Sequence, residues 1–194
     1  MAVPRQLPNA ITIVRILCAP VFLWMLLADA GADGALRWWA AVLFIVAIAT
    51  DGIDGWIARR YNIVTDLGKL LDPIADKALT GVAFVGLSIL GELPWWITIV
   101  VLVREIGITV YRFMVVSDHV LAAAWMGKLK TVAQAVALSL ALLPFAALLD
   151  SSLWQDALWW VNVVTMTVAV VLTIASGIDY IVSEARGARN RRRA

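Results

Sequence analysis

Four of the five aspartates between positions 51 and 76 of a largely apolar chain constrain the fold more than any other feature. Because a helix turns about 100° per residue, Asp51 and Asp54 fall on one face of a predicted helix, and Asp72 and Asp76 fall on one face of the next. A short polar link at 61–66 can fold the two helices into a hairpin, which brings the acidic faces together. Both helices continue into long apolar runs, so it is a poor interpretation that the aspartates merely lie on water-exposed helix surfaces.

Such a group of acids needs a cation. A carboxylate at the centre of a bilayer costs roughly 2.5–3.5 kcal/mol on insertion scales. Four that face one another also repel. An all-carboxylate site suits a hard divalent ion, so the sequence predicts Mg²⁺ or Mn²⁺. The alternative is a purely structural role, in which the carboxylates only cap helix ends or link neighbouring helices.

The composition predicts a membrane protein. Of the 194 residues, 62% are hydrophobic and only 15% are charged, and the mean hydropathy is +0.88. Soluble domains rarely exceed about half apolar residues. We therefore expect an all-α integral membrane protein that uses residues 1–194 as a single domain, with a basic tail at about 185–194. Within this tail, residues 187–194 (GARNRRRA) are expected to be disordered. The single cysteine excludes an intrachain disulfide.

Apolar runs of spanning length predict six transmembrane helices. They lie at about 11–28, 36–60, 67–90, 95–116, 125–149 and 158–181. A cleavable signal peptide is the competing interpretation of the first run. No small-residue cleavage pattern fits it well, however, and five further runs follow.

The distribution of Lys and Arg predicts the orientation. One side of the predicted bundle carries Arg5, Arg59, Arg60, Lys69, Arg112, Lys128, Lys130 and the arginines of the tail. The other side carries only Arg37. The basic side should be cytoplasmic, which places both termini and the aspartates at the cytoplasmic face of the cell membrane. Most tryptophans lie at the helix ends on the other side of the predicted bundle, away from the basic residues, as expected for an aromatic belt at the membrane interface.

The spacing of the motif resembles the signature of the CDP-alcohol phosphotransferase family. The eight matching positions are Asp51, Asp54, Gly55, Ala58, Arg59, Gly68, Asp72 and Asp76. The resemblance extends usefully from about residue 7 to residue 134. It implies an enzyme in which the hydroxyl of an alcohol displaces CMP from a CDP-linked substrate, and it suggests a homodimer.

The resemblance also implies a role for each motif residue. Asp51 and Asp72 would bridge two metal ions, while Asp54 would join the first ion and Asp76 the second. Asp76 would also act as general base toward the acceptor hydroxyl. The residues assigned to the CDP-lipid are Asn9, Thr12, Gly55, Ala58, Arg59, Thr65 and Gly68. The glycines have a second explanation, because residues without a Cβ also allow close helix packing.

Three basic residues outside the motif predict a pocket for a phosphomonoester. Arg104 lies inside an apolar run, where a cation is costly unless it is paired. Glu105 points about 100° away from it and is not expected to be its partner. Arg112 lies on roughly the same face, and Lys128 begins the next run on the same side. The alternative is that these residues snorkel to the interface, which explains Lys130 well but Arg104 poorly.

Three segments suggest which alcohol accepts the phosphatidyl group. LPNAITIVR, VREIGITVYR and AWMGKLKTVAQ resemble segments of bacterial phosphatidylglycerophosphate synthases, which join CDP-diacylglycerol to glycerol 3-phosphate. A cardiolipin synthase of the same family, with phosphatidylglycerol as acceptor, is an alternative, as is a phosphatidylinositol-phosphate synthase. Outside the family, the acids could line a divalent-cation transporter, although they lie at only one end of the predicted bundle.

Overall fold

The structure is a computed structural model that describes residues 7–60, 66–114, 124–149 and 151–191. For residues 7–11, 51–60, 66–74, 76, 112–114, 124, 146, 184 and 187–191 it describes the backbone only. The elements are α1 (Leu7–Asp29), α2 (Ala35–Arg60), α3 (Asp66–Ile89), α4 (Trp95–Met114), α5 (Ala124–Leu142), the 3₁₀ helix η1 (Phe145–Leu148) and α6 (Ser152–Arg191). The predicted all-α fold class is confirmed for these residues, none of which lies in a strand.

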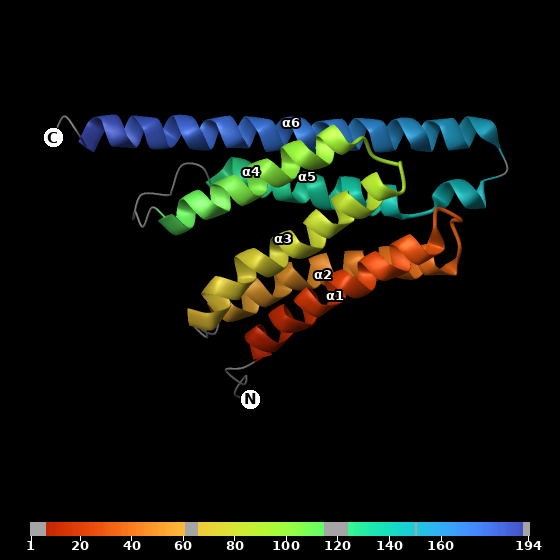
Figure 1. The fold of residues 1–194 in the computed structure, drawn as a ribbon, viewed down its shortest axis with the longest axis horizontal. Helices are drawn as coiled ribbons and strands as arrows, with labels where there is room; N and C mark the ends of the chain where they lie inside the picture. Colours follow the sequence, from red (N-terminus) through yellow and green to blue (C-terminus); the bar gives the residue numbers. More distant parts are fainter. Residues whose placement is uncertain (1–6, 61–65, 115–123, 150, 192–194) are drawn as a thin grey trace.

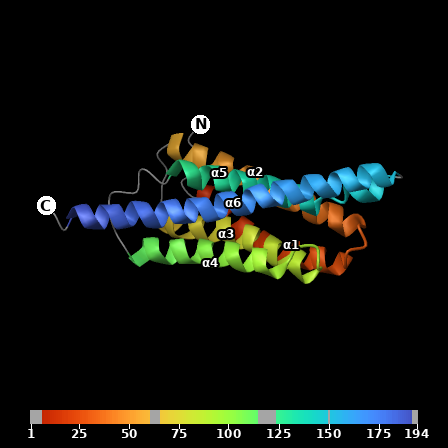
Figure 2. The same ribbon diagram turned by 90° about the horizontal axis from the view of Figure 1, so that it is seen from above.

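The helices form two groups that run along one long axis (Figures 1 and 2). In the first group α1 packs against both α2 and α3, and in the second α5 packs along α6. Contacts of α2 with α5 and of α3 with α4 join the two groups. The groups diverge toward the end where α2 finishes and α3 begins (Figure 1). We call this the open end, and the end with the α1–α2 and α3–α4 connections the closed end.

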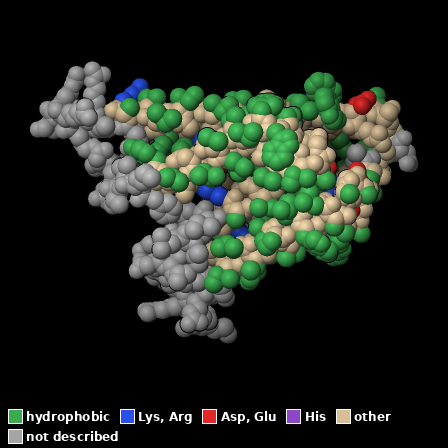
Figure 3. Space-filling view, in the orientation of Figure 1, with side chains coloured by type: hydrophobic (Ala, Val, Ile, Leu, Met, Phe, Trp, Pro, Cys, Tyr) green, Lys and Arg blue, Asp and Glu red, His purple; other side chains and the backbone are tan. Residues whose placement is uncertain are grey.

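The apolar core lies mainly between α1, α2, α3 and α5. Phe22 and Phe44 are fully buried, with ring centroids 5.6 Å apart, and Phe84 and Leu138 are buried beside them in the same cluster. The outward faces carry many large apolar side chains as well, and hydrophobic side chains, in green, are spread over the whole described part of the face in Figure 3. An apolar exterior of this extent is typical of a surface that contacts lipid.

Two helices of the described part are long and apolar enough to cross a bilayer, over Thr12–Asp29 and Ser152–Ser183. Shorter apolar helical segments lie at Ala35–Thr50 and Lys77–Ile89. Six spanning helices therefore remain a prediction, although six α-helices are present among the residues described.

The last two predicted helices have different bounds in the structure. The fifth was expected to reach 149, but α5 ends at Leu142, because Pro144 cannot continue the hydrogen-bond ladder and disfavours helix at the residue before it. The sixth was expected at 158–181, but α6 begins at Ser152 and continues to Arg191. The expectation of disorder from residue 187 is therefore wrong as far as Arg191. The helix continues through this segment because alanine and arginine are good helix formers and because cations are favoured near a helix C-terminus.

Arg37 fastens the closed end of the bundle. Its side chain is only 3% exposed, and it donates to both carboxylate oxygens of Glu92, from Nη1 at 2.6 Å and from Nη2 at 2.5 Å. Its Nε donates to the carbonyl of Leu142 and its Nη2 to that of Ala141, each at 3.0 Å. The carboxylate of Asp29 accepts from the backbone N–H of Arg37 at 3.3 Å. One guanidinium thus joins the start of α2 to the end of α5 and to the α3–α4 turn.

We expect Arg37→Met to destabilise the protein by about 3 kcal/mol, because it leaves two carbonyls and a carboxylate without their donor. Thermal unfolding in detergent would show this as a fall of several degrees in the midpoint. Asp156→Asn, at an exposed position near the start of α6, is the control and should leave the midpoint unchanged. A midpoint for Arg37→Met equal to that of the wild type would contradict this account.

Candidate active site

The four motif aspartates lie on two neighbouring helices at the open end. Asp51 and Asp54 belong to the last part of α2, and Asp72 and Asp76 to the first half of α3. The predicted hairpin is thus confirmed at the level of the two helices. The four side chains lie outside the described residues, so the way they would hold a metal ion stays a prediction. Among the side chains that are described, no three His, Cys, Asp or Glu gather as metal ligands.

The residues assigned to the CDP-lipid are distributed over the same helices. Gly55, Ala58 and Arg59 lie in α2 and Gly68 lies in α3, all at positions where only the backbone is described, and Thr65 lies outside the described residues. Asn9 is in the first turns of α1, again without a described side chain.

Thr12 is buried on α1, and Arg15, one turn further on, is buried as well. Both continue the stripe of Ala19, Phe22 and Leu26 that packs α1 into the core, because residues three and four apart share a helix face. The sequence analysis selected Thr12 and missed Arg15. The apolar stripe is the signal that would have found it.

A buried ionic cluster lies where α3, α4 and α5 meet, and we call Lys77, Arg104, Glu105 and Lys130 the Glu105 cluster. Glu105 Oε1 accepts from Lys130 Nζ at 2.5 Å and from Arg104 Nη1 at 3.0 Å. Lys77 Nζ lies 4.0 Å from Glu105 Oε2 and donates to the carbonyl oxygen of the same residue at 3.4 Å. It also donates to the hydroxyl of Thr109, which in turn donates to that carbonyl at 2.7 Å.

The cluster corrects one expectation from the sequence and decides one alternative. Glu105 was not expected to pair with Arg104, yet the two form an ion pair, because the long arginine side chain bends back across the angle between neighbouring residues. Snorkelling, the alternative explanation for Lys130, does not apply, because its side chain is only 7% exposed.

The predicted acceptor pocket is assembled only in part. Arg104 joins the Glu105 cluster, whereas Lys128 is exposed on α5 and takes no part in the ion pairs of that cluster. The side chain of Arg112 lies outside the part of the chain that is described. Lys77 is the cation of the Glu105 cluster that the sequence analysis did not consider.

Arg104 is held in place by α6. Its Nη2 donates to the hydroxyl of Ser176 at 2.8 Å, and this hydroxyl donates to the carbonyl of Thr173 at 3.0 Å. A Cβ added at Gly177 would lie 3.3 Å from Cγ of Arg104, so the glycine leaves room for the arginine stem. The guanidinium is therefore fixed between α4 and α6.

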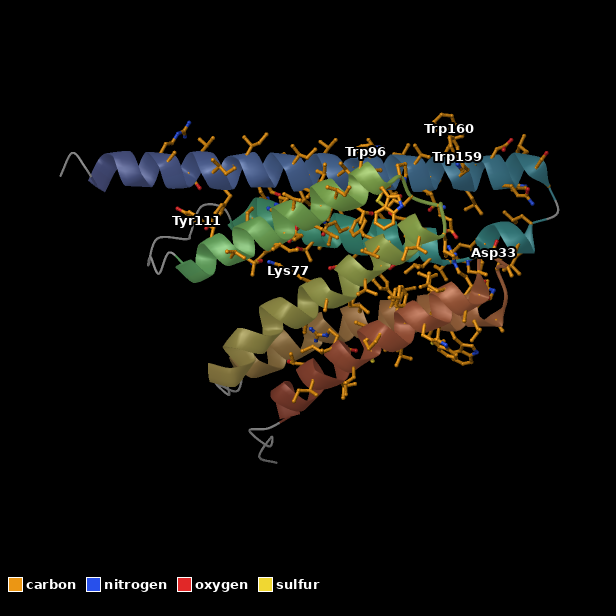
Figure 4. The ribbon with its side chains drawn as sticks, viewed as in Figure 1. Asp33, Lys77, Trp96, Tyr111, Trp159 and Trp160 are labelled. Atoms are coloured by element: carbon orange, nitrogen blue, oxygen red, sulfur yellow. The ribbon has the colours of Figure 1, made fainter. Side chains whose placement is uncertain are left out.

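The Glu105 cluster gathers three cations around one carboxylate. Lys77 follows Asp76 directly and lies between α3 and α4 in Figure 4. Helix α3 thus carries two motif positions, whose acids suit a divalent ion, next to a cation that suits an anion. Residues of both kinds are suited to phosphate groups.

Comparison with known proteins agrees with this chemistry. The sequence model of the CDP-alcohol phosphatidyltransferase family matches residues 5–175. A protein of Mycobacterium tuberculosis (strain H37Rv) named "Probable phosphatidylglycerophosphate synthase" is 43% identical over 176 residues, covering 91% of this chain and 80% of the relative.

Two further relatives bear the name "CDP-diacylglycerol--glycerol-3-phosphate 3-phosphatidyltransferase". The protein of Bacillus subtilis (strain 168) is 38% identical over 188 residues, covering 90% of this chain and 93% of the relative. That of Rickettsia prowazekii (strain Madrid E) is 33% identical over 184 residues, covering 93% and 96%. With the family match extending over most of its length, the chain belongs to the CDP-alcohol phosphatidyltransferase family of enzymes.

Proposed function

We propose that this enzyme transfers the phosphatidyl group of CDP-diacylglycerol to glycerol 3-phosphate and releases CMP. The observation that carries the proposal is that three cations, Lys77, Arg104 and Lys130, gather around Glu105. Of these, Lys77 directly follows Asp76 on α3. A phosphomonoester carries about −1.5 to −2 charges near neutral pH and suits such a cluster. The acceptor named for two of the relatives, glycerol 3-phosphate, has this group.

In the proposed reaction a hydroxyl oxygen of the acceptor forms a bond to the phosphatidyl phosphorus. The bond from that phosphorus to the bridging pyrophosphate oxygen breaks, and CMP leaves with the bond electrons. Asp76 is proposed to take the proton of the attacking hydroxyl. The residues proposed to bind the CDP-lipid are Asn9, Thr12, Gly55, Ala58, Arg59, Thr65 and Gly68, and the buried place of Thr12 beside the motif helices supports this.

Asp51, Asp54, Asp72 and Asp76 are proposed to hold two Mg²⁺ or Mn²⁺ ions. The donor set fits such ions, since it offers only carboxylate oxygens from two adjacent helices. When bound, the ions would neutralise phosphate charge and acidify the acceptor hydroxyl.

We also propose that all six α-helices span the cell membrane, with both termini and the open end in the cytoplasm. The uneven distribution of Lys and Arg supports this orientation. Exposed Trp159 and Trp160 lie toward the closed end in Figure 4, where an interfacial belt on the opposite face of the membrane would place them. A homodimer is part of the proposal through the family resemblance alone.

The acceptor assay tests the proposal. Purified enzyme with CDP-diacylglycerol should release CMP when glycerol 3-phosphate is added. Free glycerol should be a poor acceptor, since each lost charge-assisted contact costs roughly 1.5–3 kcal/mol, or about tenfold or more in affinity. Release of CMP with phosphatidylglycerol alone would indicate a cardiolipin synthase. Release with an inositol phosphate alone would indicate a phosphatidylinositol-phosphate synthase. No CMP with any acceptor would favour a transporter.

Loss of a metal ligand should stop the reaction. Asp51→Asn and Asp72→Asn are each expected to lower turnover by at least about a hundredfold, because one bridging carboxylate is removed. EDTA should inactivate the wild type, and added Mg²⁺ or Mn²⁺ should restore it. Asp156→Asn is the control and should retain full turnover. Near-normal turnover of the Asp51 and Asp72 variants after EDTA treatment would refute the metal site.

Single cysteines test the orientation. In a Cys18→Ala background, Ser151→Cys at the closed end should react with an impermeant thiol reagent added outside intact cells. Ala185→Cys, near the end of α6, should react only after the cells are opened. Both positions are exposed in the structure, so the side of the membrane on which each lies decides whether the reagent reaches it. Labelling of Ala185→Cys from outside would reverse the proposed topology.

A further inference from the structure

One face of α6 changes from apolar to basic along its length. Residues three, four or seven apart share a helix face, and on this face Arg186 is exposed one turn after the exposed Val182. The helical backbone continues to the position of Arg189 on the same face. We call this face the outer stripe of α6, and its exposed apolar residues are Trp160, Val164, Val168, Val171, Ile178 and Val182.

The outer stripe lies opposite the side of α6 that packs into the bundle. On the packed side Thr173 accepts a hydrogen bond from Gln134 of α5, and Ser176 accepts one from Arg104 of α4. Met166 and Ala169 are buried on that side as well. The described part of the bundle leaves the outer stripe exposed, so its apolar part is a surface for lipid.

The apolar part of the outer stripe has the length of the hydrocarbon core of a bilayer. A helix rises about 1.5 Å per residue, so Trp160 and Val182 are about 33 Å apart along the axis, against roughly 30 Å for the hydrocarbon core. Tryptophan prefers the interface, so Trp160 marks one boundary of the core and Val182 the other. Arg186 follows about 6 Å further on, at the level of the lipid phosphates.

A tryptophan of the neighbouring helix marks the same boundary. Helix α5 runs antiparallel to α6 (Figure 1), and Gln134 Nε2 donates to Thr173 Oγ1 at 2.8 Å, which fixes their register. Trp125 precedes Gln134 by as many residues as Val182 follows Thr173, so Trp125 and Val182 lie at about the same level. Trp125 is exposed, as an interfacial residue would be.

Beyond this boundary α6 continues as a basic helix. It extends to Arg191, past the described ends of α4 and α5 (Figure 1). The sequence from Asp179 to Ala194 contains five arginines and two acids, a formal net charge of +3. Asp179 is itself exposed close to Val182, so the arginines lie further from the hydrocarbon core than this acid. Arginines next to the end of a spanning helix attract the head groups of anionic lipids.

We propose that the outer stripe of α6 ends in a binding surface for anionic phospholipids, at Arg186 and Arg189. The acyl chains pack on Ile178 and Val182 while the phosphate meets the guanidinium groups, which favour phosphate oxygens. Because it uses both the apolar and the basic part of the stripe, the surface selects a lipid over a soluble anion. It lies on α6, whereas the proposed reaction centre lies on α2 and α3.

The test measures lipid binding by the purified full-length protein in detergent micelles, where orientation in a membrane plays no part. The probes are phosphatidylserine and phosphatidylcholine with the same acyl chains, and the apparent Kd of each is obtained from the lipid that copurifies. The wild type should bind phosphatidylserine more tightly. A basic residue near the membrane surface is worth about fivefold in affinity, so Arg186→Gln with Arg189→Gln should weaken phosphatidylserine binding about 25-fold. Phosphatidylcholine binding should change by less than about threefold.

Arg186→Lys with Arg189→Lys is the matched control, because it keeps both charges. Its Kd for phosphatidylserine should stay within about threefold of that of the wild type, and a loss as large as that of the glutamine pair would contradict a site based on charge. Sodium phosphate should displace phosphatidylserine no better than sodium chloride of equal ionic strength. Stronger displacement by phosphate would identify a site for free anions and overturn the proposal.

The arginines could instead serve only to orient α6 during insertion. The glutamine pair would then bind phosphatidylserine as tightly as the wild type, and the inference would be wrong. If the pair does not fold, as judged by thermal unfolding in detergent, Arg186→Gln alone replaces it and should weaken binding about fivefold. An unchanged Kd in that variant would overturn the inference equally. The assay contains neither CDP-diacylglycerol nor an acceptor, so its outcome is independent of the proposed function.

Discussion

The structure depends on one constraint, which is that a charge inside an apolar bundle must have partners. Arg37 and Glu105 show two ways in which this chain satisfies it. At the closed end one guanidinium meets one carboxylate in a bidentate pair, and backbone carbonyls take its remaining donors. At the interface of α3, α4 and α5 one carboxylate meets three cations. The first arrangement joins helices at the closed end, whereas the second gathers cations from α3, α4 and α5 around one carboxylate.

The two arrangements lie in different parts of the molecule. Arg37 holds helices together at the closed end, and the positions of the aspartate motif lie at the open end. Arg37 joins α2, α5 and the α3–α4 turn at the end where the two helix groups converge. From there the groups diverge toward the end of α2 and the start of α3, where the aspartates lie (Figure 1). The contacts of Arg37 hold the helices together at the closed end, and the core around Phe22 and Phe44 is shared by α1 and α2. The two helix groups can therefore diverge at the open end while the core stays packed.

The sequence predicted the first four helices and the motif hairpin well, because long apolar runs and their polar interruptions determine where such helices begin and end. The sequence pattern was less informative where a single residue determines the end of a helix, as Pro144 does for α5. Side-chain partners were the least predictable. A helical wheel gives the direction in which a side chain leaves the backbone, but not how far arginine bends back, so the pair of Arg104 with Glu105 was missed. The burial of Lys130 could have been inferred from Leu138 on the same face of α5.

The division of roles along the chain also explains why the motif alone does not specify the acceptor. The aspartates and glycines between 51 and 76 are proposed to bind the CDP-lipid and the metal ions, which every acceptor within this family would require. Discrimination is a difference of affinities between competing acceptors, so it must come from residues that only one of them can use. A phosphomonoester and a lipid phosphodiester differ by up to one negative charge, so cations outside the motif would favour the former. Arg104 and Lys130 lie on α4 and α5, outside the motif, so we expect residues of these two helices to decide between acceptors.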